Sequence, residues 1–273
     1  MQPPYRTTAY RYPNERLILV LTIVLVLLVI ALTATATICV SVIFILAAVV
    51  LAYASSRSHH QALIDRAHPV STQGTPHLAK LVQECVTRLQ PGVVQVFVTP
   101  NRQLNAYTFG LDSPKVVVLY SALLQVMDDD EMRFIIGHEL GHVALGHTRL
   151  NSLVGGMAGI PSNSAASALL MMAFLWWNRA CEHSADRAGL LACGKPEKAI
   201  TALIKLVAGP AGQTPGGLEL AYRQIDAEDD TLLGSLGEVV GTHPMLIRRI
   251  NALRSYVASE QYRRLQTLVN RNA

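Results

Sequence analysis

The stretch "HELGHVALGH", from His138 to His147, places three histidines and one glutamate within ten residues. His138 and His142 are four residues apart, so on a helix both imidazoles project from the same face. Two imidazoles at this spacing can bind one zinc ion, and Glu139 can reach a water molecule there without ligating the metal. Because a pattern with three fixed positions also arises by chance, its surroundings must support it.

The residues around this stretch favour a helix. Asp128, followed three residues later by Glu131, forms a plausible capping box, and the acidic cluster suits a helix N-terminus. We therefore predict one helix over residues 129–150. We also expect Gly141 to leave room beside the metal-binding face.

The third histidine of the stretch does not fit the same metal. His147 lies five residues after His142, which turns it by about 140° on a helix with 3.6 residues per turn. The metzincin pattern would need glycine at 145 and histidine at 148, where this chain has Leu145 and Thr148. His147 is therefore interpreted as a structural or supporting residue, and another ligand must come from elsewhere.

The segment "NRACEHSADRAG" offers that ligand. Glu182 and Asp186 are four residues apart, on one helical face, and follow an apolar run. Glu182 would complete a set of two histidines and one glutamate with an open fourth position, which is the catalytic arrangement of zinc. Asp186 would accept a hydrogen bond from a ligand imidazole. The alternatives are an ordinary solvated pair of acids, or His183 as ligand, which points about 100° away from Glu182.

A long apolar segment indicates a membrane. Residues 17–53 contain no charge, while a span needs roughly 20 apolar residues. Two short helices turning near "TATAT", residues 33–37, fit this length, and both flanks are basic, which places both on the cytoplasmic side. We favour this hairpin over a single long helix, although "TATAT" holds no glycine or proline for the turn.

Composition limits the remaining possibilities. Only 15% of the 273 residues are charged, against about 25% in a typical soluble domain, and the mean hydropathy is +0.30. The net charge of +4 without a dense basic run predicts no nucleic-acid partner. The four cysteines are scattered, so they indicate neither a disulfide framework nor a zinc knuckle.

The periodicity of the remaining chain predicts an α+β domain, mainly helical. An amphipathic helix is expected at 76–89, three short strands at 93–98, 105–110 and 115–120, and a further helix from about residue 164. Its apolar core, residues 168–177, is too short to span a bilayer. The predicted organisation is a cytosolic tail (1–16), a transmembrane hairpin (17–53) and a metal-binding domain with a three-stranded sheet (54–273).

Four motifs resemble the HtpX-like membrane zinc metalloproteases, relatives of the CAAX prenyl proteases. They are "NAYT" from Asn105, "HELGH" from His138, "RACEHSAD" from Arg179 and "THPMLIRRI" from Thr242. The motif from Arg179, which follows the second histidine by about 40 residues, and the motif from Thr242 make the match more specific than "HELGH" alone. The resemblance covers roughly residues 70–260.

This resemblance implies a zincin-type metalloprotease domain with one Zn²⁺ on His138, His142 and Glu182, and Glu139 as general base. It implies that Asn105 lies on an edge strand where an extended polypeptide substrate docks, and that His243 and Arg249 approach the cleft. We expect Arg249 to contact substrate and His243 to donate to the developing oxyanion; alternatively, His243 only starts a helix before Pro244.

The resemblance further implies a multi-pass protein of the cell membrane, in contact with the lipid bilayer, whose catalytic domain faces the cytoplasm. Misfolded membrane proteins would be among its substrates. HtpX proteins typically carry a second pair of membrane helices between the zinc helix and the glutamate helix, and this chain has only a loop and a short apolar core there. That departure leaves the substrate range open. The competing functions are a catalytically silent membrane scaffold and a processing enzyme for lipidated peptides.

Overall fold

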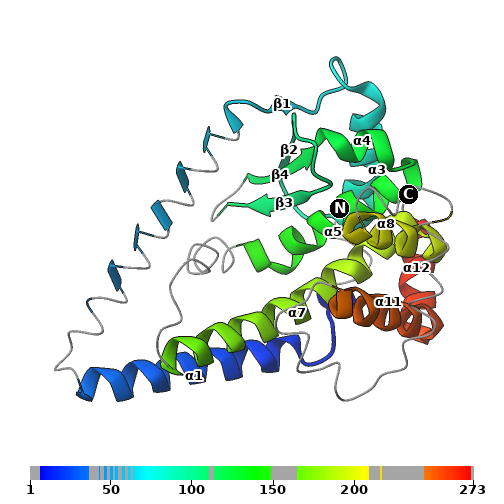
Figure 1. The fold of residues 1–273 in the computed structure, drawn as a ribbon. Helices are drawn as coiled ribbons and strands as arrows, with labels where there is room; N and C mark the ends of the chain where they lie inside the picture. The colour runs from blue at the N-terminus through cyan, green and yellow to red at the C-terminus, as the bar shows by residue number, and fades with distance from the viewer. Residues whose placement is uncertain are drawn as a thin grey trace.

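The computed structural model describes residues 7–36, 64–110, 114–148, 165–208 and 243–271, with isolated residues between 43 and 62 and residue 216. It is mainly helical with one small sheet, as the periodicity predicts (Figure 1). Its described elements, in chain order, are η1 (Thr7–Tyr10), α1 (Glu15–Ala36), β1 (His68–Pro69), α3 (Pro76–Leu89), β2 (Val94–Thr99), β3 (Ala106–Phe109), β4 (Lys115–Tyr120), α4 (Ser121–Val126), α5 (Asp129–Leu145), α7 (Ala165–Cys193), α8 (Pro196–Ala208), α11 (His243–Ala258) and α12 (Glu260–Asn270).

The sheet has four strands in the order β1-β2-β4-β3, so the prediction of three strands is wrong. The missed strand, β1, is two residues long and pairs antiparallel with β2. It contains a proline and has no alternating apolar run, so it carries no sequence signal of a strand; proline is tolerated there because β1 lies at the sheet edge. β2 and β4 are parallel, and β3 runs antiparallel to β4 at the other edge.

The strand β4 separates two hydrophobic clusters. Val117 and Leu119 pack with Leu81 of α3 and Phe134 of α5 in the main core, whereas Val118 belongs to a smaller cluster on the opposite face. This alternation follows from the two-residue period of a strand. The predicted amphipathic helix is confirmed as α3, which buries residues at helical spacing against that core.

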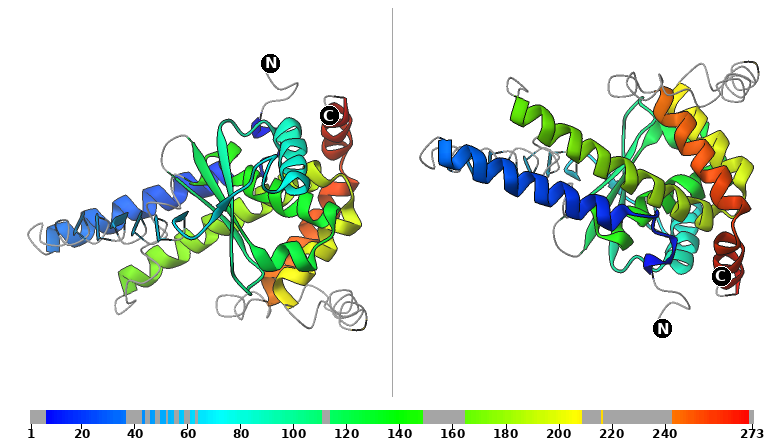
Figure 2. Two further views of the ribbon diagram at one scale, coloured as in Figure 1. Left: turned by 90° about the horizontal axis from the view of Figure 1, so that it is seen from above. Right: turned by 90° about the horizontal axis from the view of Figure 1, so that it is seen from below.

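Helix α1 is the one helix among the described segments that is long and apolar enough to cross a bilayer. Much of its surface is exposed and apolar, for example Leu17, Leu27 and Leu32. It runs beside the N-terminal half of α7 and away from the sheet, as Figures 1 and 2 show. Thr22 of α1 donates to the carbonyl of Ala173 in α7 at 3.2 Å. Most of the second arm of the predicted hairpin lies outside the described residues.

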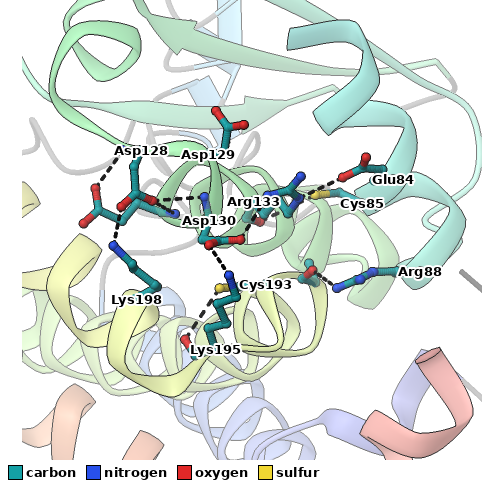
Figure 3. A network of polar contacts seen from close by, with 12 residues as sticks. Glu84, Cys85, Arg88, Asp128, Asp129, Asp130, Arg133, Cys193, Lys195 and Lys198 are labelled. Carbon is teal, nitrogen blue, oxygen red and sulfur yellow. Dashed lines mark hydrogen bonds and ion pairs between the residues drawn. The ribbon is translucent and has the colours of Figure 1, made fainter. Parts of the chain in front are cut away.

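The N-terminus of α5 is fixed by its own cap and by its neighbours. Asp128 accepts from the backbone of Glu131 at 2.9 Å, and the Glu131 side chain accepts from the backbone of Asp128, which confirms the capping box. Arg133 joins α5 to Glu84 of α3 at 2.8 Å, and Lys198 of α8 pairs with Asp128 (Figure 3). These contacts fix the position of α5 relative to α3 and α8.

The C-terminus of α5 differs from the prediction. The helix ends at Leu145 rather than at 150, because Gly146 adopts the left-handed conformation with φ of 80° and caps it. His147 therefore does not continue the regular turn of α5. Its direction has to be taken from the structure rather than from helical geometry.

Candidate metal centre

Helix α5 presents His138 and His142 side by side. Their Nε2 atoms are 3.2 Å apart and both side chains are buried. Two Nε2 lone pairs converging at this distance repel one another unless a proton or a cation lies between them. The pair of histidines predicted from spacing is thus brought together with the nitrogens facing one point.

Close packing of α5 against α7 brings the distant carboxylate to these rings. A Cβ atom at Gly137 would lie 2.4 Å from Cβ of Ala192, and one at Gly141 would lie 2.6 Å from Cβ of Ala188. Only glycine permits this approach. The room that Gly141 was expected to leave beside the metal-binding face is occupied by α7.

Adding a methyl group at this contact should weaken the metal site. Gly141→Ala is expected to lower the free energy of unfolding by about 1–3 kcal/mol, the usual range for overpacking, and to weaken zinc binding as α7 moves away. The measurements are chemical denaturation and zinc competition. The double variant Gly141→Ala/Ala188→Gly, which moves the methyl across the interface, should recover most of the zinc affinity; no recovery would argue against helix separation as the cause.

Glu182 of α7 reaches both histidines. Its two carboxylate oxygens lie 3.5 Å from Nε2 of His138 and of His142, respectively. Burial alone would raise the pKa of Glu182, but Arg249 at 3.2 Å and the two imidazoles hold that pKa well below its usual value. Glu182 is therefore an anion at neutral pH, as a carboxylate ligand must be.

Asp186, one turn after Glu182, supports His138 from behind. Its Oδ1 lies 3.0 Å from Nδ1 of His138, the ring nitrogen that faces away from Glu182. Burial would raise the pKa of Asp186, yet the guanidinium of Arg249 and the hydrogen bond from His138 lower it to about 2. The predicted contact between Asp186 and a ligand imidazole is present in the structure.

Arg249 lies at the site but is committed to carboxylates. Its Nε and one terminal nitrogen bind Asp186 at 2.8 and 2.6 Å, and its other nitrogen faces Glu182. Such a bidentate pair fixes both partners. Arg249 therefore clamps two acids and also lines the pocket, as expected from its predicted approach to the cleft; its contact with substrate stays a prediction.

A pocket of about 300 Å³ opens at this cluster. It is lined by Glu139, by the three converging side chains and by residues 105–108 at the edge of the sheet. Glu139 is 6% exposed, and burial raises the pKa of its carboxyl. Asn105 directly precedes the edge strand β3, where its carbonyl accepts from the backbone of Tyr120 at 3.0 Å.

Three other histidines considered from the sequence, His243, His183 and His147, are not among the converging ligands of the described residues. Helix α11 begins at His243, but the side chain of His243 lies outside the described residues. His183 stacks on Tyr12 with ring centroids 4.7 Å apart, while its neighbour Glu182 faces the histidines. His147 lies behind His142, with the two Nδ1 atoms 3.0 Å apart.

The sequence prediction did not include Glu15, the first residue of α1. Its carboxylate is 1% exposed and lies 3.1 Å from Nε2 of His147, so it belongs to the surroundings of the metal ligands. The only signal in the sequence was a glutamate two residues before a long uncharged apolar segment. Its partner is more than a hundred residues away, which no local pattern can indicate.

The residues present fit a zinc ion. The ligand atoms of His138, His142 and Glu182 all lie within 4.8 Å of one another. Two imidazole nitrogens and one carboxylate, with a pocket on the open side, form the ligand set typical of catalytic zinc. The hydrogen bond from His138 to Asp186 is the usual support for such a ligand.

Comparison with known proteins agrees with this geometry. The family described as peptidase family M48 matches residues 72–257. The chain is 25% identical to a chloroplastic plastoglobule-localized metallopeptidase 48 of Arabidopsis thaliana over 218 residues, 75% of this chain and 63% of the relative. It is 28% identical to an HtpX homologue of Kineococcus radiotolerans over 169 residues, 60% and 53% of the two chains.

An HtpX protease of Acinetobacter baumannii is 28% identical over 233 residues, which are 70% of this chain and 74% of that protein. The chain spans less than two-thirds of the length of the Arabidopsis and Kineococcus relatives. The family match includes every side chain of the pocket described above. Because that match covers more than half of the chain, the protein belongs to peptidase family M48 and is an HtpX-like metalloprotease of that family.

Proposed function

We propose that the protein is a membrane-anchored, zinc-dependent endopeptidase. The observation that carries this proposal is the convergence of His138, His142 and Glu182 on one point beside Glu139, in a pocket that residues 105–108 of the sheet edge also line. Bound zinc would polarise the scissile carbonyl and lower the pKa of a water molecule to about 7.

The side chains of the pocket have distinct roles in this proposal. Glu139 takes a proton from the attacking water and passes it to the leaving amine, as a buried carboxylate with a raised pKa can do. Asp186 keeps the Nδ1 proton of His138 in place, so that Nε2 presents its lone pair. Arg249 keeps Asp186 and Glu182 ionised and oriented. The role of His243 as a donor to the oxyanion remains part of the proposal.

In this proposal the substrate binds along the edge of the sheet at β3, which borders the pocket. Among the described strands β3 pairs only with β4, and residues 105–108 line the pocket. An extended polypeptide can add to such an edge through main-chain hydrogen bonds, which tolerate varied sequences. This mode of binding suits an endopeptidase acting on unfolded segments, including those of misfolded membrane proteins. Asn105 would hold the end of that segment.

Metal removal tests the proposal directly. The purified full chain in detergent is expected to contain about one zinc per chain and to hydrolyse casein. Chelation should abolish hydrolysis, and added zinc should restore it, because the ligand set is complete only with the ion. If zinc binds while casein is not cleaved, the alternative of a catalytically silent membrane scaffold holds instead.

The position of α1 supports a proposal for the membrane topology. Tyr10, before this helix, and Leu78, after it, lie in one hydrophobic core. If α1 crosses a bilayer, both of its flanks therefore lie on one side, and the chain crosses an even number of times. This supports the hairpin of residues 17–53, a multi-pass protein of the cell membrane, and a catalytic domain on the side of the basic N-terminus, the cytoplasm.

A reporter fusion checks this topology. A reporter placed at residue 60 is expected to show a cytoplasmic signal, because the chain returns to the domain that contains Tyr10. A reporter in the same vector fused before residue 7 serves as the matched control and should give the same signal. Opposite signals from the two fusions would contradict the hairpin.

A further inference from the structure

A chain of three side chains leads from the metal ligands to the start of α1. Nε2 of His142 faces His138 and Glu182, while its Nδ1 lies 3.0 Å from Nδ1 of His147. Nε2 of His147 lies 3.1 Å from Oε1 of Glu15. The side chains of His142, His147 and Glu15 are all buried, so water molecules do not compete for these hydrogen bonds.

The allocation of protons along this chain has one consistent solution. For Nε2 of His142 to present a lone pair to a metal, its Nδ1 must carry the proton and donate it to Nδ1 of His147. The proton of His147 is then on Nε2 and is donated to the carboxylate of Glu15.

The same allocation argues against a second metal at this place. Glu15, His147 and Cys181 have ligand atoms within 4.8 Å of one another. As a ligand, Nε2 of His147 would need a lone pair while Nδ1 accepts from His142, so the ring would have to lose its last proton. The ion pair between Arg11 and Glu15 also opposes a cation there.

Glu15 is held firmly at the end of the chain. Arg11 pairs with it and also donates to the carbonyl of Leu145 at the end of α5, at 3.1 Å. Ser184 of α7 donates to the other oxygen of Glu15 and accepts from the backbone of Tyr12 at 2.8 Å. A buried carboxylate is tolerated when it is paired and hydrogen-bonded in this way.

The two metal-facing histidines are thus supported in parallel ways. His138 donates to Asp186, which Arg249 clamps, and His142 reaches Glu15 through His147, with Arg11 as the clamp. The first support comes from α7 and α11, inside the catalytic domain. The second comes from the first turn of the apolar helix α1.

We propose that Glu15 and His147 are positioning residues for His142, so that the first residue of the membrane helix α1 contributes to the metal affinity of the catalytic pocket through this hydrogen-bonded relay. This inference rests on the proposed zinc function. It predicts that the N-terminal segment is part of the metal centre rather than only an anchor.

The test uses the full chain in detergent micelles, with zinc affinity measured by competition with a chelator and the visible spectrum recorded after loading with cobalt(II). His147→Leu and Glu15→Ala are each expected to weaken zinc binding by about 10- to 100-fold, the usual effect of removing a partner of a ligand. Both should alter the cobalt spectrum. Glu15→Gln and His147→Gln, which keep an acceptor in place, should recover most of the affinity.

The double variant His147→Leu/Glu15→Ala tests whether Glu15 acts on His142 through His147, which we call the relay. The alternative is that the two residues support the fold independently. If Glu15 acts through His147, the double variant binds zinc no more weakly than His147→Leu alone. Additive losses would overturn the proposal, as would wild-type zinc affinity and cobalt spectrum in His147→Leu. If His147→Leu does not fold, the zinc affinities of His147→Gln and Glu15→Ala are compared instead. Equal losses of zinc affinity in these two variants would overturn the proposal.

Thr22→Val is the matched control. It removes the buried hydrogen bond between α1 and Ala173 of α7 but touches no member of the relay. We expect unchanged zinc affinity with a lowered midpoint of thermal unfolding; a zinc loss as large as that of Glu15→Ala would assign the effect to helix docking alone and overturn the proposal. If the wild type itself binds no zinc, the proposed function fails first, so the two failures are distinguishable.

Discussion

Replacing Glu139 by glutamine is expected to lower kcat for casein hydrolysis by about 10²- to 10⁴-fold, the usual contribution of a general acid or base. Glutamine keeps the size of the side chain but cannot take a proton from water. Glu139 lines the pocket without belonging to the group of three ligand atoms, so the zinc content should stay at the wild-type value. The measurements are initial rates with labelled casein and metal analysis of the same preparation.

Glu131→Gln is the matched control for this experiment. Glu131 is a second buried glutamate on α5, but it serves the capping box and pairs with Lys205 at 2.6 Å, away from the pocket. Its replacement should lower stability and leave kcat within a few-fold of the wild type. Equal activity of wild type and Glu139→Gln, with zinc bound in both, would indicate a silent scaffold and refute the proposed chemistry.

Local patterns predict the local elements of this fold because they report interactions within a few residues. The apolar spacing in 76–89 gives α3 with its predicted ends, and the capping box of Asp128 and Glu131 is formed as expected. Gly146 was the signal for the end of α5, and its left-handed conformation shows that a glycine can outweigh the apolar period around it.

Tertiary contacts account for what the sequence could not show. The strand β1 exists because β2 offers it an edge, not because of its own two residues. Gly141 packs on Ala188, a contact that depends on how two helices cross. The spacing of Glu182 and Asp186 correctly placed both on one face of a helix, yet only the structure shows that Arg249 holds them together.

Removing the carboxylate of Glu182 should weaken zinc binding more than removing a residue that only supports a ligand. Glu182→Ala is expected to weaken zinc binding by more than about 100-fold, since the loss of a ligand's partner alone costs about 10- to 100-fold. Casein hydrolysis should fall with it at ordinary zinc concentrations. Arg249 keeps its bidentate pair with Asp186 in this variant, so the charge of the guanidinium is still compensated and the domain should fold.

Asp186→Asn provides the graded comparison, because Asp186 contacts His138 but not the point where the three ligand atoms converge. Its zinc affinity should lie between that of the wild type and that of Glu182→Ala, and excess zinc should restore its hydrolysis more readily. The order of the two variants is the informative result. If Glu182→Ala bound zinc as tightly as the wild type while Asp186→Asn did not, the third ligand would be Asp186, and Glu182 would serve only to pair with Arg249.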